Sequence, residues 1–185
     1  MTYPGIGICG HLRSGKDSVA EYLVQNYGYT QFAFGDALKD DFHRRFPEIP
    51  RDPKPRLGYQ SHGQFMRKQF GENIWVDRCF AKIDAIAAER MYADEPIRVV
   101  ISDLRQPNEY EALKSAGCVI IRVTAPEALR IDRAIKSADT FNLHDLSHET
   151  ESHINTFAVD YEIVNDGTLA ELYAKVDEVM RKVAQ

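Results

Sequence analysis

Residues 10–18 read GHLRSGKDS and hold the strongest functional signal in this chain. They fit the spacing G-x-x-x-x-G-K, in which two glycines bound a loop that ends in lysine. Gly10 and Gly15 allow the backbone to curl so that successive N–H groups point inward at phosphate oxygens. Lys16 adds a full positive charge, and the following helix adds the positive end of its dipole. The pattern predicts a cradle for the phosphates of a nucleotide.

The residues on either side of this loop occur in the order that such a cradle needs. Residues 6–9 (IGIC) form an apolar run typical of a short buried strand. After the loop, apolar residues recur at helical spacing from Val19 to Tyr27, and Gly28 lies where a helix would end. Strand, loop and helix follow one another, which favours a phosphate site over a glycine turn that binds nothing.

Asp17 departs from the usual pattern, which has a serine or threonine whose hydroxyl ligates Mg²⁺. A carboxylate can hold the same ion directly or through water, because Mg²⁺ is hard and keeps several waters. Asp17 could instead only favour the helix N-terminus, but it would then place negative charge beside a triphosphate. We therefore expect Asp17 to ligate the metal and Ser18 to reach the α-phosphate. Lys16 and Arg13 are also candidate catalytic residues. The residues expected to bind the nucleotide here are Gly10, Leu12, Arg13, Ser14, Gly15, Lys16, Asp17 and Ser18.

The composition is that of an ordinary globular domain. The chain has 185 residues, 44% of them hydrophobic, and a net charge of −5 without a basic run, which argues against a nucleic-acid polymer as partner. We expect no membrane-spanning segment and no export signal. The three cysteines lack metal-binding spacing, so we expect reduced thiols in a cytoplasmic protein. The oligomeric state stays open, with a homodimer as one alternative.

Apolar runs alternate with helical patterns along the chain. This alternation predicts a three-layer α/β fold, a five-stranded parallel sheet with helices on both faces. The expected strands are 3–9, 30–34, 97–102, 118–124 and 159–164; the expected helices are 16–26, 36–46, 60–70, 74–93, 107–116 and 169–183.

Two segments interrupt the alternation. Residues 36–95 predict a helical insertion, and the polar stretch within 126–152 predicts a lid. Both leave the sheet at the carboxyl ends of strands, where ligands bind in such folds. We therefore expect one domain over residues 1–185 that closes over two substrates and excludes water.

Further charged residues are expected near the loop. Asp103 follows the strand at 97–102 and could hold the waters of Mg²⁺, orient an acceptor or merely cap the next helix. Arg105 could bind a second phosphate with its guanidinium fork. Arg130 and Arg133 lie three residues apart, so they share a helix face and could neutralise charge on a transferred phosphoryl group. Either arginine could instead be a solvated surface residue.

Two more segments are candidates for ligand contact. His148 and Glu151 lie where the polar segment ends, and a hinge or substrate contact is favoured there over a metal site that includes His144. Asn165 and Gly167 belong to a tight turn expected beside the phosphate loop, where its backbone could contact a purine ring. The alternative for this turn is an ordinary connection with a threonine helix cap.

Taken together, these motifs resemble those of the deoxynucleoside monophosphate kinases of phages and bacteria, within the adenylate-kinase-like group. The chain differs from that family in lacking a proline in its second motif and in reading RKQFGE at 67–72, a region that the resemblance places against the acceptor base. The segments that carry the resemblance are RSGKDS at 13–18, FAFGDALK at 32–39, DLRQPNE at 103–109, HETE at 148–151 and NDGTLAEL at 165–172.

The resemblance implies a P-loop kinase that transfers the γ-phosphoryl group of ATP, with Mg²⁺, to a (deoxy)nucleoside monophosphate. No general base is needed, because the acceptor phosphate is already ionised at neutral pH. Alternatives are a kinase for dephospho-coenzyme A or phosphomevalonate, and a regulator that binds ATP without transferring phosphate. The candidate metal ligands are Asp17 and Asp103, the candidate catalytic residues include Asp103, Arg130 and Arg133, and the candidate substrate contacts are Asp36, Lys39, Arg67, Arg105, His148 and Glu151.

Overall fold

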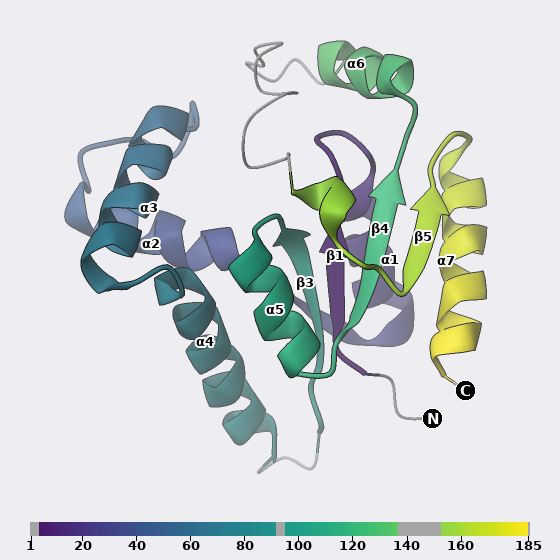
Figure 1. Cartoon of the computed structure of the whole chain (residues 1–185), viewed down its shortest axis with the longest axis horizontal. Coiled ribbons are helices and arrows are strands. Elements are labelled where there is room, and N and C mark those ends of the chain that lie inside the picture. The colour runs from purple at the N-terminus through teal and green to yellow at the C-terminus, as the bar shows by residue number, and fades with distance from the viewer. Residues whose placement is uncertain (1–3, 92–94, 137–152, 185) are drawn as a thin grey trace. The chain divides into compact units, whose positions relative to one another are not determined.

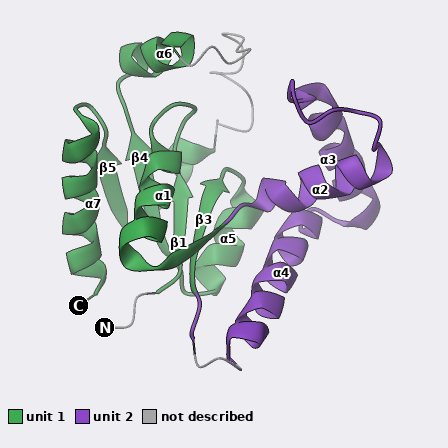
Figure 2. Ribbon diagram, turned by 180° about the vertical axis from the view of Figure 1, so that it is seen from behind, with its two compact units in different colours: residues 1–31, 98–185 green, residues 32–97 purple. Residues whose placement is uncertain are grey.

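The computed structural model describes residues 4–91, 95–136 and 153–184. The chain divides into two compact units, which Figure 2 colours separately. Unit 1 comprises residues 1–31 and 98–185, and unit 2 comprises residues 32–97. The predicted helical insertion falls within unit 2, and each unit is described by itself below.

Unit 1 is built on a five-stranded parallel sheet with the strand order β2-β3-β1-β4-β5. The labelled arrows in Figure 1 are β3, β1, β4 and β5. The prediction of a three-layer α/β fold with five parallel strands is confirmed. The strands are β1 (Ile6–Cys9), β2 (Tyr29–Phe32), β3 (Arg98–Leu104), β4 (Val119–Thr124) and β5 (Tyr161–Val164), and the helices of this unit are α1 (Lys16–Tyr27), α5 (Pro107–Ser115), α6 (Glu127–Lys136) and α7 (Leu169–Val183), with a short 3₁₀ turn η3 (Ile154–Thr156).

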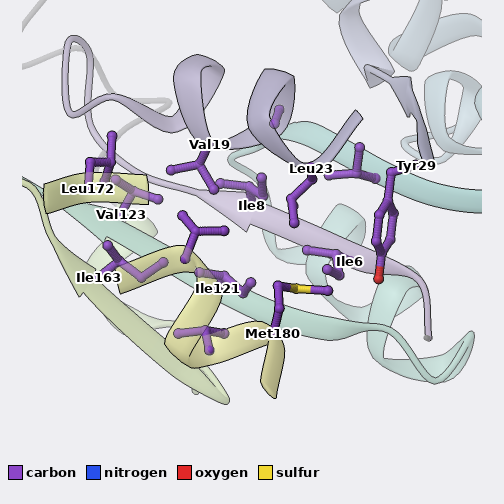
Figure 3. Packing of buried hydrophobic residues seen from close by; sticks show 14 residues of the cluster. Ile6, Ile8, Val19, Leu23, Tyr29, Ile121, Val123, Ile163, Leu172 and Met180 are labelled. Atoms are coloured by element: carbon purple, nitrogen blue, oxygen red, sulfur yellow. The ribbon is translucent and has the colours of Figure 1, made fainter. Parts of the chain in front are cut away.

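The alternation of side chains along β1 assigns the helices to the two faces of the sheet. Ile6 and Ile8 are fully buried and belong to the cluster that α1 and α7 cover, which Figure 3 shows from close by. Gly7 points to the other face, where an added Cβ would lie 2.6 Å from Leu113 of α5. The missing side chain at Gly7 lets α5 pack directly against the strand.

The helix ends follow the local chemistry of the sequence. Gly28 ends α1 in the left-handed conformation with a φ of 68°, as its position predicted. Pro107 opens α5 behind a capping box, and Thr168 caps α7 through a reciprocal pair with Glu171. These caps fix where each helix begins and therefore how the loops at the sheet edge are aimed.

Strand β3 differs from its prediction. The sequence pointed to an end at Ser102, but the strand continues to Leu104, so Asp103 lies inside it. The pairing of β1 with β3 shifts register between Gly7 and Cys9, which leaves an extra residue on β3. A bulge of this kind accommodates polar residues within a strand, and it explains why Ser102 and Asp103 looked like a strand end.

The described part of unit 2 consists of three helices that pack on one another around aromatic and aliphatic side chains. The buried side chains that join the helices include Phe34, Phe42, Met66 and Trp75. The helices are α2 (Phe34–Arg45), α3 (Arg56–Phe70) and α4 (Ile74–Met91).

Two of these helices begin earlier than predicted. Helix α2 starts at Phe34 behind Ala33, so Asp36, where the helix was expected to begin, lies in its first turn. Helix α3 starts at Arg56, directly after Pro55, instead of near residue 60. The sequence signal failed at α3 because Pro53 and Pro55 come just before its first turn and Gly58 lies within it, a composition typical of a loop.

Candidate active site

The loop between β1 and α1 is packed so tightly that only glycine fits at its first position. A Cβ on Gly10 would lie 2.4 Å from the carbonyl oxygen of Val123 and 2.7 Å from the hydroxyl of Ser14. Further on, Arg13 and Gly15 have positive φ values of 63° and 101°, which turn the backbone back on itself before α1. The loop therefore adopts the curled form that its glycines predicted.

Ser14 provides the clearest sign that this loop receives a ligand. Its side chain is fully buried, and its hydroxyl has no hydrogen-bond partner among the described residues. A buried hydroxyl without a partner carries a free-energy penalty of about 1–3 kcal/mol. The penalty disappears when a ligand atom or a water molecule enters the loop and bonds to the hydroxyl.

Lys16 and Asp17 occupy different environments although they are neighbours. The side chain of Lys16 is 7% exposed and that of Asp17 is 82% exposed, with 4.0 Å between the ammonium and the nearer carboxylate oxygen. The buried ammonium lies at the first turn of α1, where the helix dipole also favours an anion. Asp17, directed into solvent, is accessible to a hydrated cation.

Asn165 supports the loop from the far end of the chain. Its side-chain amide is buried and donates to the carbonyl of Ser14 at 2.8 Å. The same amide fills the space that a side chain on Gly15 would need, because a Cβ there would lie 2.2 Å from its nitrogen. The predicted turn at residues 165–168 therefore does lie beside the phosphate loop.

The two arginines predicted on one helix face both reach the loop from α6. Arg130 donates to the carbonyl of Leu12 at 3.5 Å, and Arg133 donates to the carbonyl of Arg13 at 3.4 Å. Arg133 also donates to the backbone and side-chain oxygens of Asn165 at 3.4 and 3.3 Å. These bonds are long, so the guanidinium groups can exchange them for phosphate oxygens at little cost.

The segment that follows the predicted lid also touches the loop. The Nε2 atom of His11 lies 3.2 Å from the side-chain oxygen of Asn155. Arg122 of β4 donates to the carbonyls of Ile154 and Phe157 at 3.0 and 2.6 Å, which holds this segment against the sheet. Arg122 was not among the predicted site residues, because an arginine inside an otherwise apolar strand belongs to no recognisable motif.

Asp103 lies within β3, the strand beside β1, and Arg105 directly follows that strand. Asp103 is half-buried within β3, and the backbone N–H of Arg105 donates to Glu109 at 2.9 Å. Among residues 4–91, 95–136 and 153–184, no group of three or more ligating side chains is arranged to hold a metal ion. A magnesium ion bound by Asp17 or Asp103 would thus take its remaining ligands from phosphates and water, as Mg²⁺ commonly does.

The remaining predicted residues fall into four groups. Asp36 and Lys39 form a half-exposed ion pair at 2.9 Å in unit 2, and Arg67 is half-buried on α3. Gly167 precedes the cap of α7, where a Cβ would meet the carboxylate of Glu171 at 2.2 Å. The other two groups are simpler: Ser18 is half-buried in the first turn of α1, and His148 and Glu151 lie outside the described residues.

Unit 2 contains a charged cluster that was not predicted from the sequence. The carboxylate of Asp41 is 1% exposed and accepts hydrogen bonds from three arginines and one histidine, which come from all three helices. Nitrogen atoms of His62, Arg45 and Arg78 lie 2.8, 2.9 and 2.9 Å from its oxygens, and Arg44 is the fourth partner. We call Asp41 and these four partners the Asp41 cluster.

The Asp41 cluster keeps its carboxylate ionised. Burial by itself would raise the pKa of Asp41, but hydrogen bonds from His62, Arg78 and Arg44 outweigh burial and hold the pKa well below its usual range. The spacing of Asp41 with Arg44 and Arg45 follows the helical i,i+3 and i,i+4 rule and was readable from the sequence. His62 and Arg78 come from other helices, so their contacts with Asp41 could not be predicted from sequence spacing.

Comparison with known proteins gives one family match and several distant relatives. Residues 6–155 match the model of the AAA domain family. A protein of Acanthamoeba polyphaga mimivirus, "Putative deoxynucleotide monophosphate kinase", is 26% identical over 97% of this chain and 97% of its own length. A protein of Sulfurisphaera tokodaii, "UPF0200 protein", is 27% identical over 96% of both chains.

Solved structures share the fold. A shikimate kinase from Acinetobacter baumannii superposes with a TM-score of 0.56 at 15% identity, covering 98% of this chain and 94% of that one. A structure described as a putative kinase from Chloroflexus aurantiacus gives a TM-score of 0.58 at 16% identity, covering 100% and 98%. The sheet and its loop thus have the P-loop kinase fold. Within the described residues, no helix is both long and apolar enough to cross a membrane.

Proposed function

Because the chain belongs to the AAA domain family, we propose that it is a nucleotide kinase that transfers the γ-phosphoryl group of ATP to the phosphate of a (deoxy)nucleoside monophosphate. The observation that carries this proposal is the loop itself. It combines a buried ammonium at Lys16, a helix N-terminus and a buried hydroxyl at Ser14 that has no partner among the described residues. All three features favour a polyphosphate anion.

On the donor side, the loop N–H groups and Lys16 hold the β- and γ-phosphates. Asp17 holds Mg²⁺ directly or through water, Asp103 supports the same ion or the acceptor, and Ser18 reaches the α-phosphate. When bound, Mg²⁺ would neutralise part of the negative charge on the phosphates. The exposed carboxylate of Asp17 suits a hydrated ion, because Mg²⁺ keeps much of its water shell.

The guanidinium groups of Arg130 and Arg133 stabilise charge on the transferring phosphoryl group, with Arg13 contributing from the loop. Both α6 arginines now rest on loop carbonyls through bonds of 3.4–3.5 Å. They need to move only a short way to exchange these neutral acceptors for charged phosphate oxygens, which bind guanidinium groups more strongly. A regulator that merely senses ATP has no need for two arginines at this place.

The acceptor assignment has separate support. The name of the mimivirus relative points to a deoxynucleotide monophosphate as acceptor, and the motifs of the sequence point the same way. We assign Asp36, Lys39, Arg67 and Arg105 to acceptor contacts, together with His148 and Glu151. No side chain need act as a general base, because the acceptor phosphate is ionised at neutral pH.

A coupled assay of ADP release tests the proposal. The purified chain is given Mg²⁺ and ATP with each common ribo- and deoxyribonucleoside monophosphate, and separately with dephospho-coenzyme A and phosphomevalonate. We expect ADP release that depends on at least one nucleoside monophosphate. Release with one of the other two acceptors would move the function to another small-molecule kinase, and ATP binding without release for any acceptor would favour a regulator.

A further inference from the structure

Asn165 bonds to Ser14 although the two residues are 151 positions apart in the sequence. The sheet holds Asn165 in place beside the loop. It follows β5, and its backbone N–H donates to the carbonyl of Thr124 at the end of β4, at 2.7 Å. Its side chain is 6% exposed. A side chain that is buried and fixed by a strand end has little freedom to turn away, so its bond to the loop is a built feature of the fold.

The bond from Asn165 determines how one peptide group of the loop is oriented. In a trans peptide, the carbonyl and the following N–H point in opposite directions. The bond of 2.8 Å draws the carbonyl of Ser14 toward Asn165, so it turns the N–H of Gly15 away from Asn165. That N–H is one of the loop groups that a phosphate-binding pattern requires to point inward.

Gly15 and Asn165 fit together sterically as well. Gly15 has a φ of 101°, which other residues rarely adopt, and its missing side chain leaves the space that the amide of Asn165 occupies. Without that amide the carbonyl of Ser14 would lose its partner, and the peptide could rotate about the flexible glycine. The loop therefore depends on Asn165 for the orientation of this one N–H.

The opposite end of the amide binds Arg133. The side-chain oxygen of Asn165 accepts from Arg133 at 3.3 Å while its nitrogen donates to Ser14. An amide can do both at once, whereas a carboxylate can only accept and an alanine can do neither. The two bonds explain why this position needs an asparagine.

We infer that Asn165 is a positioning residue that holds the Ser14–Gly15 peptide in the orientation that binds the donor polyphosphate, and that it acts through the loop instead of through the purine ring. This inference rests on the proposed function for the identity of the donor. It makes a claim of its own, because a ligand that lacks a base should depend on Asn165 as strongly as ATP does.

The test compares two ligands and two variants. Isothermal titration in the presence of Mg²⁺ measures the affinity of wild type, Asn165→Ala and Asn165→Asp for ATP and for inorganic tripolyphosphate, which has no base or sugar. We expect both variants to bind both ligands roughly tenfold or more weakly than wild type, the scale of losing one buried hydrogen bond. Asn165→Asp separates the two bonds, since its carboxylate can still accept from Arg133 but cannot donate to Ser14.

Asn26→Ala is the matched control, because Asn26 also donates its amide to a backbone carbonyl, that of Tyr22 at 3.1 Å, but on the exposed end of α1. It should bind both ligands as wild type does. Thermal unfolding without ligand identifies any variant that loses stability, and affinities are compared only among folded variants.

The outcomes separate the two proposals. A loss for ATP with unchanged tripolyphosphate affinity would show a contact to the base and overturn the inference while leaving the kinase proposal intact. Unchanged affinity for both ligands, even in a variant with lower thermal stability, would reduce Asn165 to a structural role and also overturn it. A wild type that binds neither ligand would overturn the kinase proposal and this inference together.

Discussion

The phosphate loop of unit 1 and the Asp41 cluster of unit 2 both gather positive charge, but they neutralise it differently. Around Asp41, three guanidinium groups and an imidazole converge on one buried carboxylate, so much of the charge is satisfied inside the protein. In the loop, the ammonium of Lys16 is buried and the nearest carboxylate oxygen of Asp17 is 4.0 Å away on a mostly exposed side chain.

This difference separates a charge cluster that stabilises a fold from one that is suited to a ligand. A buried carboxylate whose partners come from α2, α3 and α4 ties those helices together. A lysine at a helix N-terminus, beside a buried hydroxyl that has no partner among the described residues, is poised for an incoming anion. Substitutions in the loop should therefore change activity more than stability, and substitutions at Asp41 should do the reverse.

The largest effect is expected for Lys16→Ala. Phosphoryl transfer should fall about a thousandfold, because a charge that stabilises the transferring group is lost. The thermal midpoint should not fall, since the variant removes a cation whose burial costs free energy in the folded protein. The coupled ADP assay and thermal unfolding measure the two quantities.

Lys182→Ala provides the control for that variant, because Lys182 forms an exposed pair with Glu178 at 2.8 Å on α7. Its activity and stability should both match wild type within experimental error. Normal turnover in Lys16→Ala would remove the distinction between the loop and the Asp41 cluster.

Asp41→Asn should have the next largest effect, on stability. It leaves the surrounding cations without their anion, which typically costs about 3 kcal/mol or more of unfolding free energy. Trp75, the single tryptophan, is buried in unit 2 and reports on it directly in urea unfolding followed by fluorescence. ATP affinity should change much less than stability.

Asp40→Asn is the matched control in the neighbouring position. Asp40 is 63% exposed and pairs with Arg51 at 3.4 Å, so its loss should cost less than about 1 kcal/mol. Equal destabilisation by the two substitutions would show that the burial of Asp41 contributes nothing special.

Arg133→Ala should reduce kcat by roughly ten- to a hundredfold, with a smaller change in stability. Its guanidinium bonds to the carbonyl of Arg13 at 3.4 Å and to the side chain of Asn165 at 3.3 Å are long and therefore weak. We expect its strongest interaction to be with the charge that develops on the phosphoryl group in the transition state. Steady-state kinetics would measure the fall in kcat, with Arg181→Ala as a control at an exposed position. A rise in the KM for ATP with unchanged kcat would instead assign Arg133 to ground-state binding.

The smallest effect concerns pH. The pKa of Asp41 is lowered in the folded protein, so its stabilisation is complete above the unfolded value near 4 and is lost as pH falls below it. Between pH 4 and pH 3, wild type should lose up to about 1.4 kcal/mol more than Asp41→Asn. Urea midpoints of Trp75 fluorescence at the two pH values test this, and parallel losses would contradict it.

The sequence predicted the loop well because its signals are local. The spacing of Gly10, Gly15 and Lys16, and the helix end at Gly28, depend on residues close together in the chain. The sequence also predicted that Arg130 and Arg133 share a face, since helical spacing alone decides that.

Other features required contacts between distant parts of the chain. The bond between Asn165 and Ser14 and the partners of Asp41 on other helices leave no short motif. The predicted strand ended at residue 102, two residues before the end of β3, because the bulge at Ser102 and Asp103 interrupts the apolar pattern that marks a strand. Tertiary pairing with β1 keeps those polar residues in the sheet.

A crystal structure with a non-hydrolysable ATP analogue and Mg²⁺ tests the central claim most directly. We predict oxygen atoms of the β- and γ-phosphates within about 2.7–3.2 Å of the backbone nitrogens of the loop and of the Lys16 ammonium. The hydroxyl of Ser14 should gain a partner in the same complex. An analogue bound elsewhere, with the loop unchanged and empty, would contradict the account.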